Sequence, residues 1–284
     1  MSANIKNKIV IREIYNLIPV IEMFRQDGLV IFGIDNVLTI PSDEDDFRNQ
    51  CRAKLWQSIK YRLTSKKIEF LESIIMANSK KILIDHRIVD VFDHMKSQQI
   101  PSIALTAINS GDFGIIKHMQ DFKIKELNMV GISFENLTPF CGEYLISELK
   151  NSNFAPMLAS GVVLTAGIDK GLVLEYIFSK YNYYPKSIIF VDDCVDNFES
   201  LKNLCIKFKI DFHGFYYKAA SLLPLPIIDE ELEKWRFDIL EQECVWLNYK
   251  KLRKKYSSHD NYYLPKVNQF LSWVAGTVTK ISKY

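Results

Sequence analysis

Short apolar runs alternate with amphipathic stretches along most of the chain. Runs that are almost wholly apolar suit strands buried on both faces of a parallel sheet. Six runs are predicted to be strands: "LVIFGI" (29–34), "SIALTA" (102–107), "MVGISF" (129–134), "GVVLTA" (161–166), "SIIFVDD" (187–193) and "DFHGFYY" (211–217).

Helical spacing characterises most of the segments between these runs. Residues 9–25 carry apolar side chains at the intervals of an amphipathic helix, namely Ile9, Ile14, Leu17, Ile18 and Ile21. Further helices are expected at "RIVDVFDHMKSQQ", "KGLVLEYIFSKYN" and "NFESLKNLCIKF". Strands that alternate with helices form right-handed βαβ units. The chain is therefore predicted to be an α/β protein with a doubly wound, mostly parallel, Rossmann-like sheet.

Two regions interrupt this alternation. Residues 43–80 are charged, favour helix and carry no strand pattern, which is typical of a helical cap inserted after the first strand. Residues 229–255 begin acidic and end basic, as the helix dipole prefers, and are predicted to form one long helix. The expected domains are an α/β core at 1–42 and 81–228, a cap insert at 43–80 and a helical C-terminal extension at 229–284.

Composition and charge narrow the function classes. With 284 residues, 48% of them hydrophobic, the chain can bury a sizeable core. A formal net charge of +2 argues against a broad nucleic-acid surface, although it leaves room for a local basic patch. The five cysteines show no CxxC spacing, so they indicate reduced thiols rather than zinc ligands or disulfides.

Targeting signals are not evident in the sequence. Charged residues interrupt the first 28 positions, so a Sec signal peptide is not expected, and no apolar run is long enough for a transmembrane segment. A soluble, cytoplasmic protein is the simplest prediction. Secretion into a host cell without a Sec signal peptide stays open as an alternative.

Several polar residues follow the predicted strands. Ligands of open parallel sheets lie outside the carboxyl ends of the strands, where Asp35, Thr106, Asp192 and Asp193 are expected. Each has an ordinary structural alternative when taken alone. Asp35 and Asn36 fit a turn, Thr106 a strand-end hydroxyl, and Lys170 a solvated helix start. The joint, ordered pattern is what makes a site the better interpretation.

Four segments carry a family resemblance when taken together: "FGIDNVLT", "IALTAI", "GIDKGLVLEYI" and "IIFVDDCVDNFESL". Their order and spacing resemble the haloacid dehalogenase-like (HAD) superfamily of Mg²⁺-dependent phosphatases and phosphotransferases. The likeness extends from about residue 9 to about residue 253. It is closest to a poorly characterised bacterial branch found in intracellular bacteria.

The resemblance implies roles for individual positions. Asp35 would move protons, Thr106 would hold a phosphoryl oxygen, and Lys170 would neutralise phosphate at a helix N-terminus. Asp192 and Asp193, with Asp35, would bind Mg²⁺, a hard ion that prefers oxygen ligands. Asp196 and Asn197 would be loop residues that support the site.

Gly33 departs from the pattern at the position where the family has its aspartyl nucleophile. Glycine offers no oxygen, so no aspartyl-phosphate can form there and one expected Mg²⁺ ligand is missing. Val37 and Ile108 depart from the pattern nearby, at positions where threonine and arginine are often found. The sequence thus predicts a degenerate phosphatase site, a pseudoenzyme that holds Mg²⁺ weakly.

Two function classes follow from this interpretation. The first is a module that binds a phosphorylated small molecule, a phosphoprotein or another protein, with a bacterial effector role left open. The alternative is an active Mg²⁺-dependent phosphomonoesterase (a hydrolase) that uses Asp35 or a metal-bound water. The C-terminal helix expected at 266–284 fits contact with a membrane surface or a protein partner. Docking on the chain's own core is the favoured interpretation of that helix.

Overall fold

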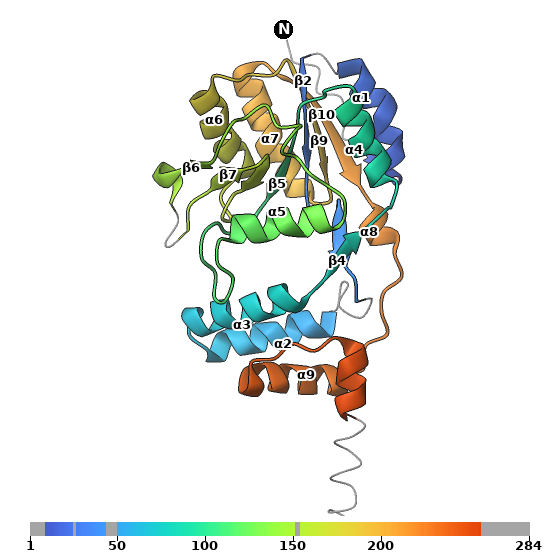
Figure 1. The fold of residues 1–284 in the computed structure, drawn as a ribbon, viewed down its shortest axis with the longest axis vertical. Coiled ribbons are helices and arrows are strands. Elements are labelled where there is room, and N and C mark those ends of the chain that lie inside the picture. Colours follow the sequence, from blue (N-terminus) through green and yellow to red (C-terminus); the bar gives the residue numbers. More distant parts are fainter. Residues whose placement is uncertain (1–8, 25–26, 44–49, 151–153, 257–284) are drawn as a thin grey trace, which may run out of the picture. The chain divides into compact units, whose positions relative to one another are not determined.

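The computed structural model of the protein describes residues 9–24, 27–43, 50–150 and 154–256 (Figure 1). The chain divides into two compact units. Unit 1 contains residues 1–42 and 80–225, and unit 2 contains residues 43–79 and 226–284. Each unit is described separately below.

Unit 1 is built on an eight-stranded sheet with the order β1-β10-β9-β2-β5-β8-β7-β6. The pairs from β1 to β8 are parallel, and β7 and β6 are added antiparallel at one edge. The strands are β1 (Ile9–Ile11), β2 (Gly28–Phe32), β5 (Ser102–Thr106), β6 (Tyr144–Leu145), β7 (Met157–Ala159), β8 (Val162–Leu164), β9 (Ser187–Asp192) and β10 (Asp211–Tyr217). A separate antiparallel pair joins β3 (Thr39–Pro41) to β4 (Lys81–Leu83), the strands on either side of the insertion.

Helices cover both faces of the sheet. In Figure 1, α1 (Ile18–Phe24) and α4 (Ile88–Ser97) lie on one side, and α6 (Lys170–Tyr181) and α7 (Val195–Phe208) lie on the other. The remaining helical elements of unit 1 are η1 (Ile14–Leu17), α5 (Met119–Met129), η3 (Ser147–Leu149) and α8 (Ala219–Leu222). This arrangement confirms the predicted doubly wound, mostly parallel α/β fold.

The central strands are buried on both faces, as their apolar composition predicts. All five residues of β2, all five of β5 and all six of β9 are buried. Side chains of these strands pack against α6 and α7 in one cluster that includes Ile31, Leu105, Phe178 and Phe190. Burying each such side chain contributes roughly 1.5–3 kcal/mol. The strand ends that carry the predicted site residues are thereby fixed in place.

The predicted helix at residues 9–25 is only partly correct. Residues 9–11 pair with β10 as strand β1, and the helix that follows starts as the 3₁₀ segment η1. Ile14, Leu17 and Ile21 are buried at intervals of three and four, so they line one face of η1 and of α1, which follows it directly. The apolar spacing therefore predicts the helix from Ile14 onward, whereas residues 9–11 belong to the sheet.

The predicted strand at 129–134 is wrong. Helix α5 continues to Met129, and Gly131 ends it in the left-handed region at a φ of 85°. The Ile132 amide then donates to the Leu127 carbonyl at 3.0 Å, which is the long hydrogen bond of a Schellman motif. Ile132 and Phe134 are buried, so the apolar run serves the core from a loop.

Unit 2 combines the insertion with the segment after the α/β core. It contains α2 (Gln50–Arg62), α3 (Ser65–Asn78), α9 (Glu230–Glu243) and a further helix at 249–256. One apolar cluster joins Ile59 of α2 and Leu71 of α3 to Phe237 and Leu240 of α9. The single helix predicted for 229–255 is corrected by a break at Cys244, which adopts a left-handed conformation with a φ of 56°.

A buried cation organises the end of unit 2. The Arg236 guanidinium lies 3.7 Å from the centre of the Trp246 ring and 4.6 Å from that of Tyr249. Its Nε donates to the Leu247 carbonyl at 2.7 Å, and Glu233 lies within ion-pair range at 3.7 Å. Cation–π contacts of a desolvated guanidinium are each worth up to about 2 kcal/mol. They hold the segment after the break against α9.

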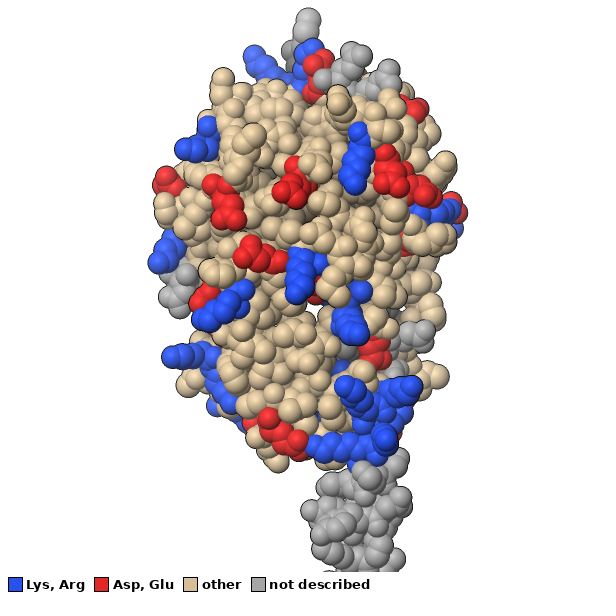
Figure 2. Space-filling view, viewed as in Figure 1, with Lys and Arg blue, Asp and Glu red and all other residues tan. Residues whose placement is uncertain are grey.

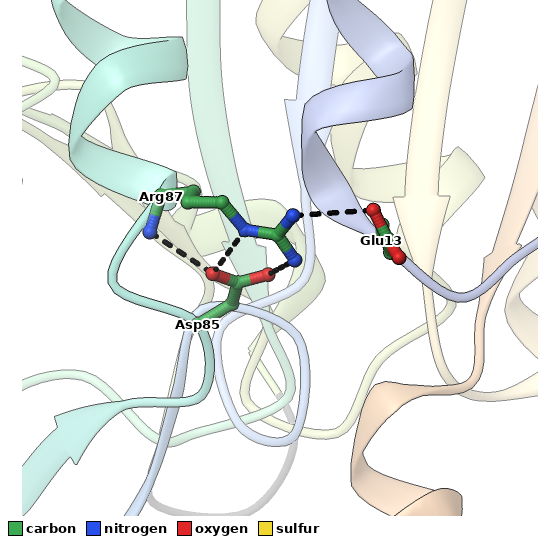
Figure 3. Close-up of polar contacts among 3 residues, drawn as sticks. All are labelled: Glu13, Asp85 and Arg87. Carbon is green, nitrogen blue, oxygen red and sulfur yellow. Dashed lines mark hydrogen bonds and ion pairs between the residues drawn. The ribbon is translucent and has the colours of Figure 1, made fainter.

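An ion cluster in unit 1 ties the chain before η1 to the start of α4 (Figure 3). Arg87 donates to both oxygens of Asp85, at 3.0 Å from Nε and 2.7 Å from Nη2, and reaches Glu13 at 3.1 Å from Nη1. These hydrogen bonds from Arg87 lower the pKa of Asp85. The bidentate geometry fixes the loop that follows β4.

The face shown in Figure 2 carries lysine, arginine and acidic side chains interspersed, without a broad field of one sign. Basic residues gather on the helix at 249–256, which bears Lys250, Lys251, Arg253, Lys254 and Lys255. No helix among the described residues has the length and apolarity needed to cross a membrane. The predicted helix at 266–284 lies outside the described residues.

Candidate functional site

The predicted site residues of unit 1 lie on adjacent strands. Strand β2 pairs with β9 on one side and with β5 on the other, and β5 pairs with β8. Asp35 follows β2, Thr106 ends β5, and Asp192 ends β9. Because these strands are parallel, their carboxyl ends share one edge of the sheet.

Lys170 and Asp192 form a buried ion pair at this edge. Lys170 is the first residue of α6, whose N-terminus is capped by the Asp169 side chain accepting from the Leu172 amide at 2.8 Å. The Lys170 Nζ lies 2.8 Å from Asp192 Oδ2, and the two residues are only 8% and 2% exposed. The structure thus brings together two residues that lie 22 positions apart in the sequence.

The other oxygen of Asp192 is also fully used. Asp192 Oδ1 accepts from the Cys194 amide at 2.8 Å and from the Asn197 side-chain amide at 2.9 Å. Asn197, expected in a loop, lies in the first turn of α7 together with Asp196. The strand-end carboxylate is therefore held on both oxygens by three nitrogen donors.

Gly33 lies directly against this ion pair. Its amide donates to the Val191 carbonyl at 2.8 Å, which continues the β2–β9 ladder by one residue. A Cβ placed on Gly33 would lie 3.0 Å from Asp192 Oδ2 and 3.0 Å from Val37 Cγ2. A side chain at position 33 would therefore be crowded by Asp192 and Val37.

Asp35 lies between two lysines that the sequence did not identify. Its Oδ1 is 3.0 Å from Lys81 Nζ on β4 and 3.7 Å from Lys123 Nζ on α5. The Lys123 side chain is 2% exposed and also reaches Glu126 at 2.8 Å, whereas the Asp35 side chain stays 40% exposed. Burial would raise the pKa of Asp35, but the Lys123 and Lys81 ammonium groups outweigh it and lower the pKa to about 2. Asp35 is consequently a carboxylate at neutral pH.

The turn after β2 positions the remaining acid. Asn36 adopts a φ of 63°, which asparagine tolerates better than most residues, and its amide donates to the Thr39 carbonyl at 2.8 Å. The Asn36 side chain hydrogen-bonds Asp193. Burial and the neighbouring Asp192 carboxylate nevertheless raise the pKa of Asp193. Asp193 is half-buried and shares the site edge with Asp192.

Thr106 is 6% exposed, and its carbonyl accepts from the Thr165 amide at 2.8 Å. Thr165 follows β8 and is completely buried, with no hydrogen-bond partner for its hydroxyl among the described residues. Two threonines therefore stand at the ends of adjacent strands. The role of Thr106 in holding phosphate stays a prediction.

Two of the three carboxylates expected to bind Mg²⁺, Asp35 and Asp192, already have ammonium partners, whereas Asp193 accepts a hydrogen bond from Asn36. Gly33 supplies no side-chain oxygen, both oxygens of Asp192 are taken by nitrogen donors, and Asp35 faces two ammonium groups. Across the residues that the structure describes, no group of three or more His, Cys, Asp or Glu side chains could hold a metal ion. Mg²⁺ needs about six ligands near ideal octahedral geometry, and it would have to displace these contacts.

The depressed pKa of Asp35 leads to a prediction on stability against pH. A carboxylate whose pKa falls from 3.8 to about 2 on folding stabilises the fold at and above its unfolded value. That contribution is lost as the pH falls through about 2. In thermal unfolding, Asp35→Asn should therefore be less stable than the native chain near pH 6, and the difference should shrink toward pH 2. The exposed Glu135→Gln change serves as the control, and a pH-independent Asp35→Asn difference would contradict the assignment.

The chain matches a protein family and is similar to known proteins. Residues 9–253 match the family described as "Protein of unknown function (DUF2608)". A Chlamydia pneumoniae protein named "Putative outer membrane protein" is 26% identical over 122 residues, which make up 43% of this chain and 44% of that protein. The chain thus matches less than half the length of this relative. A solved HAD-superfamily hydrolase, subfamily IA, from Geobacter sulfurreducens aligns with a TM-score of 0.35 at 10% identity, over 75% of this chain and 96% of that one.

Proposed function

We propose that this chain, which belongs to the DUF2608 family of proteins of unknown function, is a phosphatase-like module that binds a phosphorylated ligand without efficient hydrolysis. The proposal rests on one acidic residue that is missing and on the ion pairs formed by two that remain. The nucleophile position is Gly33, and the two strand-end acids are held in ion pairs, Asp35 by Lys81 and Asp192 by Lys170. Such a site keeps the groups that recognise phosphate while lacking those that cleave its ester.

Covalent catalysis has no starting group in this site. A phosphoryl transfer that passes through an aspartyl-phosphate needs a carboxylate oxygen in line with phosphorus. Gly33 has only hydrogen there, and the Cβ space beside it is bounded by Asp192 and Val37.

Acid catalysis is equally disfavoured. An acid that protonates an alkoxide leaving group must carry a proton before the reaction. Because the Lys123 and Lys81 ammonium groups lower the pKa of Asp35, its side chain is ionised at pH 7. An ionised Asp35 is competent as a base or a hydrogen-bond acceptor but unsuitable as the acid.

The groups that support binding are a cation, a hydroxyl and a helix N-terminus. Lys170 begins α6, whose amide dipoles favour an anion in front of the first turn. Thr106 offers a hydroxyl from the neighbouring strand end. A phosphorylated small molecule or a phosphoprotein segment would provide the matching anion.

The phosphatase alternative makes the proposal testable in a single assay. We expect the native chain to hydrolyse an aryl phosphate in Mg²⁺ no faster than its Asp35→Asn and Asp192→Asn variants, because neither acid is free to act. Initial rates of product release, with circular dichroism to verify folding, provide the measurement. Mg²⁺-dependent turnover in the native chain that both substitutions abolish would establish an active phosphomonoesterase instead.

Location and further partners belong to the same proposal. We retain the cytoplasm as the expected site of action and export into a host cell, as an effector, as the alternative. The name of the Chlamydia pneumoniae relative adds the outer membrane as a third place to examine. Fractionation of the producing bacterium and its host would decide among the three. Contact of residues 266–284 with a membrane surface or a protein stays a prediction.

A further inference from the structure

The charge balance of the site differs from that of a metal-dependent phosphatase. A site with aspartates at positions 33, 35, 192 and 193 would set four carboxylates against the single ammonium of Lys170, so it would require a divalent cation before an anionic ester could enter. Here Gly33 removes one of those carboxylates.

Two further cations offset the negative charge of the remaining carboxylates. Lys81 and Lys123 both approach Asp35, and Lys123 also pairs with Glu126. Together with Lys170, three ammonium groups therefore face four carboxylates, those of Asp35, Glu126, Asp192 and Asp193. This balance is close to neutral, in contrast to the strongly anionic site that a metal ion would have to neutralise.

The two lysines beside Asp35 differ in what they can do. The Lys123 side chain is 2% exposed, so it acts on the site through Asp35 and Glu126 and is a positioning residue. The Lys81 side chain is 18% exposed, and the side chain of its carboxylate partner Asp35 is 40% exposed. A long, partly exposed ammonium is able to exchange that partner for a phosphoryl oxygen with little rearrangement.

We infer that this site recognises its phosphorylated ligand without a divalent cation, with Lys170 and Lys81 supplying the positive charge that a metal ion supplies in a phosphatase. The inference rests on the proposed function and adds its charge chemistry, a phosphomonoester dianion bound by two ammonium groups. The arrangement also explains why Asp192 is saturated by nitrogen donors. Its role is to hold Lys170 at the N-terminus of α6 rather than to hold a metal.

Titration calorimetry with inorganic phosphate tests the inference on the full chain. The titration is run in EDTA and again with excess Mg²⁺. We expect the same dissociation constant, within about twofold, in both solutions. Lys81→Met should weaken binding about tenfold, which corresponds to the loss of one ion pair of about 1.4 kcal/mol. The control is Lys117→Met, which removes the same charge from an exposed lysine that pairs with Asp112 at 2.6 Å.

Asp192→Asn gives a second test because the two mechanisms predict opposite signs. If Lys170 binds the phosphate, loss of the competing Asp192 charge should tighten binding in EDTA by severalfold. If Asp192 is a metal ligand, the same change should abolish Mg²⁺-dependent binding. Circular dichroism and the thermal midpoint verify that the variant is folded, and Lys81→Met carries the test if it is not.

Each outcome separates the inference from the function on which it rests. Phosphate binding that appears only with Mg²⁺ and is lost in Asp192→Asn would overturn the cation-independent site while keeping a phospho-ligand. Absence of phosphate binding in both solutions would overturn the proposed function, and the inference with it. Equal binding in both solutions that Lys81→Met weakens and Lys117→Met does not would support both.

Discussion

Replacing Asp192 with alanine is expected to lower the free energy of unfolding of unit 1 by about 3–5 kcal/mol, the usual cost of leaving a buried charge unpaired. The Lys170 ammonium would lose its carboxylate partner in a position where its side chain is only 9% exposed. The Asn197 amide would lose its acceptor as well. Urea unfolding followed by circular dichroism measures the loss.

Two companion variants make that result specific. Asp193→Ala removes a neighbouring, half-exposed carboxylate and should change stability by under about 1 kcal/mol. The double change of Lys170→Met with Asp192→Leu removes both charges and should recover most of the lost stability, since apolar residues commonly replace a buried pair without penalty. If Asp192→Ala and Asp193→Ala are equally mild, the Lys170–Asp192 pair contributes little to the fold.

Installing an acid at position 33 is expected to have the largest effect on activity. Gly33→Asp would supply the missing carboxylate beside Asp192, and hydrolysis of an aryl phosphate should rise by about 10²-fold or more over the native chain. The gain should stay well below the roughly 10⁶-fold effect that a nucleophile has in a fully formed site. The reason is crowding, because the new Cβ would lie 3.0 Å from both Asp192 Oδ2 and Val37 Cγ2.

The ionised state of Asp35 also predicts which phosphate esters the Gly33→Asp variant would hydrolyse. Aryl oxyanions leave without a proton, whereas alkoxides need an acid, and Asp35 is held as a carboxylate by Lys81 and Lys123. Gly33→Asp should therefore act on aryl phosphates and leave alkyl phosphates almost untouched. Gly33→Asn, which has the same shape without the charge, is the matched control. Equal rates for the two variants would show that lost chemistry at position 33 is not what limits turnover.

Much of the fold could be predicted because buried strands appear in the sequence as short runs of apolar residues. Five of the six runs are strands, and four of these, β2, β5, β8 and β9, are buried at every residue, as a strand covered on both faces requires. The sixth run, 129–134, shows the limit of that rule. Ile132 and Phe134 are apolar for the same core, but Gly131 turns the chain there and the backbone bonds to α5 instead of to a strand.

The candidate site also combines residues that the sequence predicts with residues that only the structure reveals. Asp35, Thr106 and Asp192 were predictable as neighbours because the carboxyl ends of parallel strands meet at one edge. Lys81 and Lys123 were not, because a lysine in a charged stretch looks like any solvated lysine until an acid faces it in space. The space lost around Gly33 was also beyond the sequence, since it depends on where Val37 and Asp192 place their atoms.

The way unit 2 is assembled has a practical consequence for anyone who shortens this protein. Its apolar cluster takes Leu71 and Ile74 from the inserted helices but Phe237, Leu240 and Trp246 from a segment more than 150 residues further along the chain. Cutting after residue 228 would look like trimming a tail from the α/β core. It would instead expose the apolar faces of α2 and α3 to solvent. The shortened protein should therefore aggregate or bind chaperones, even though every strand of the large sheet is still present.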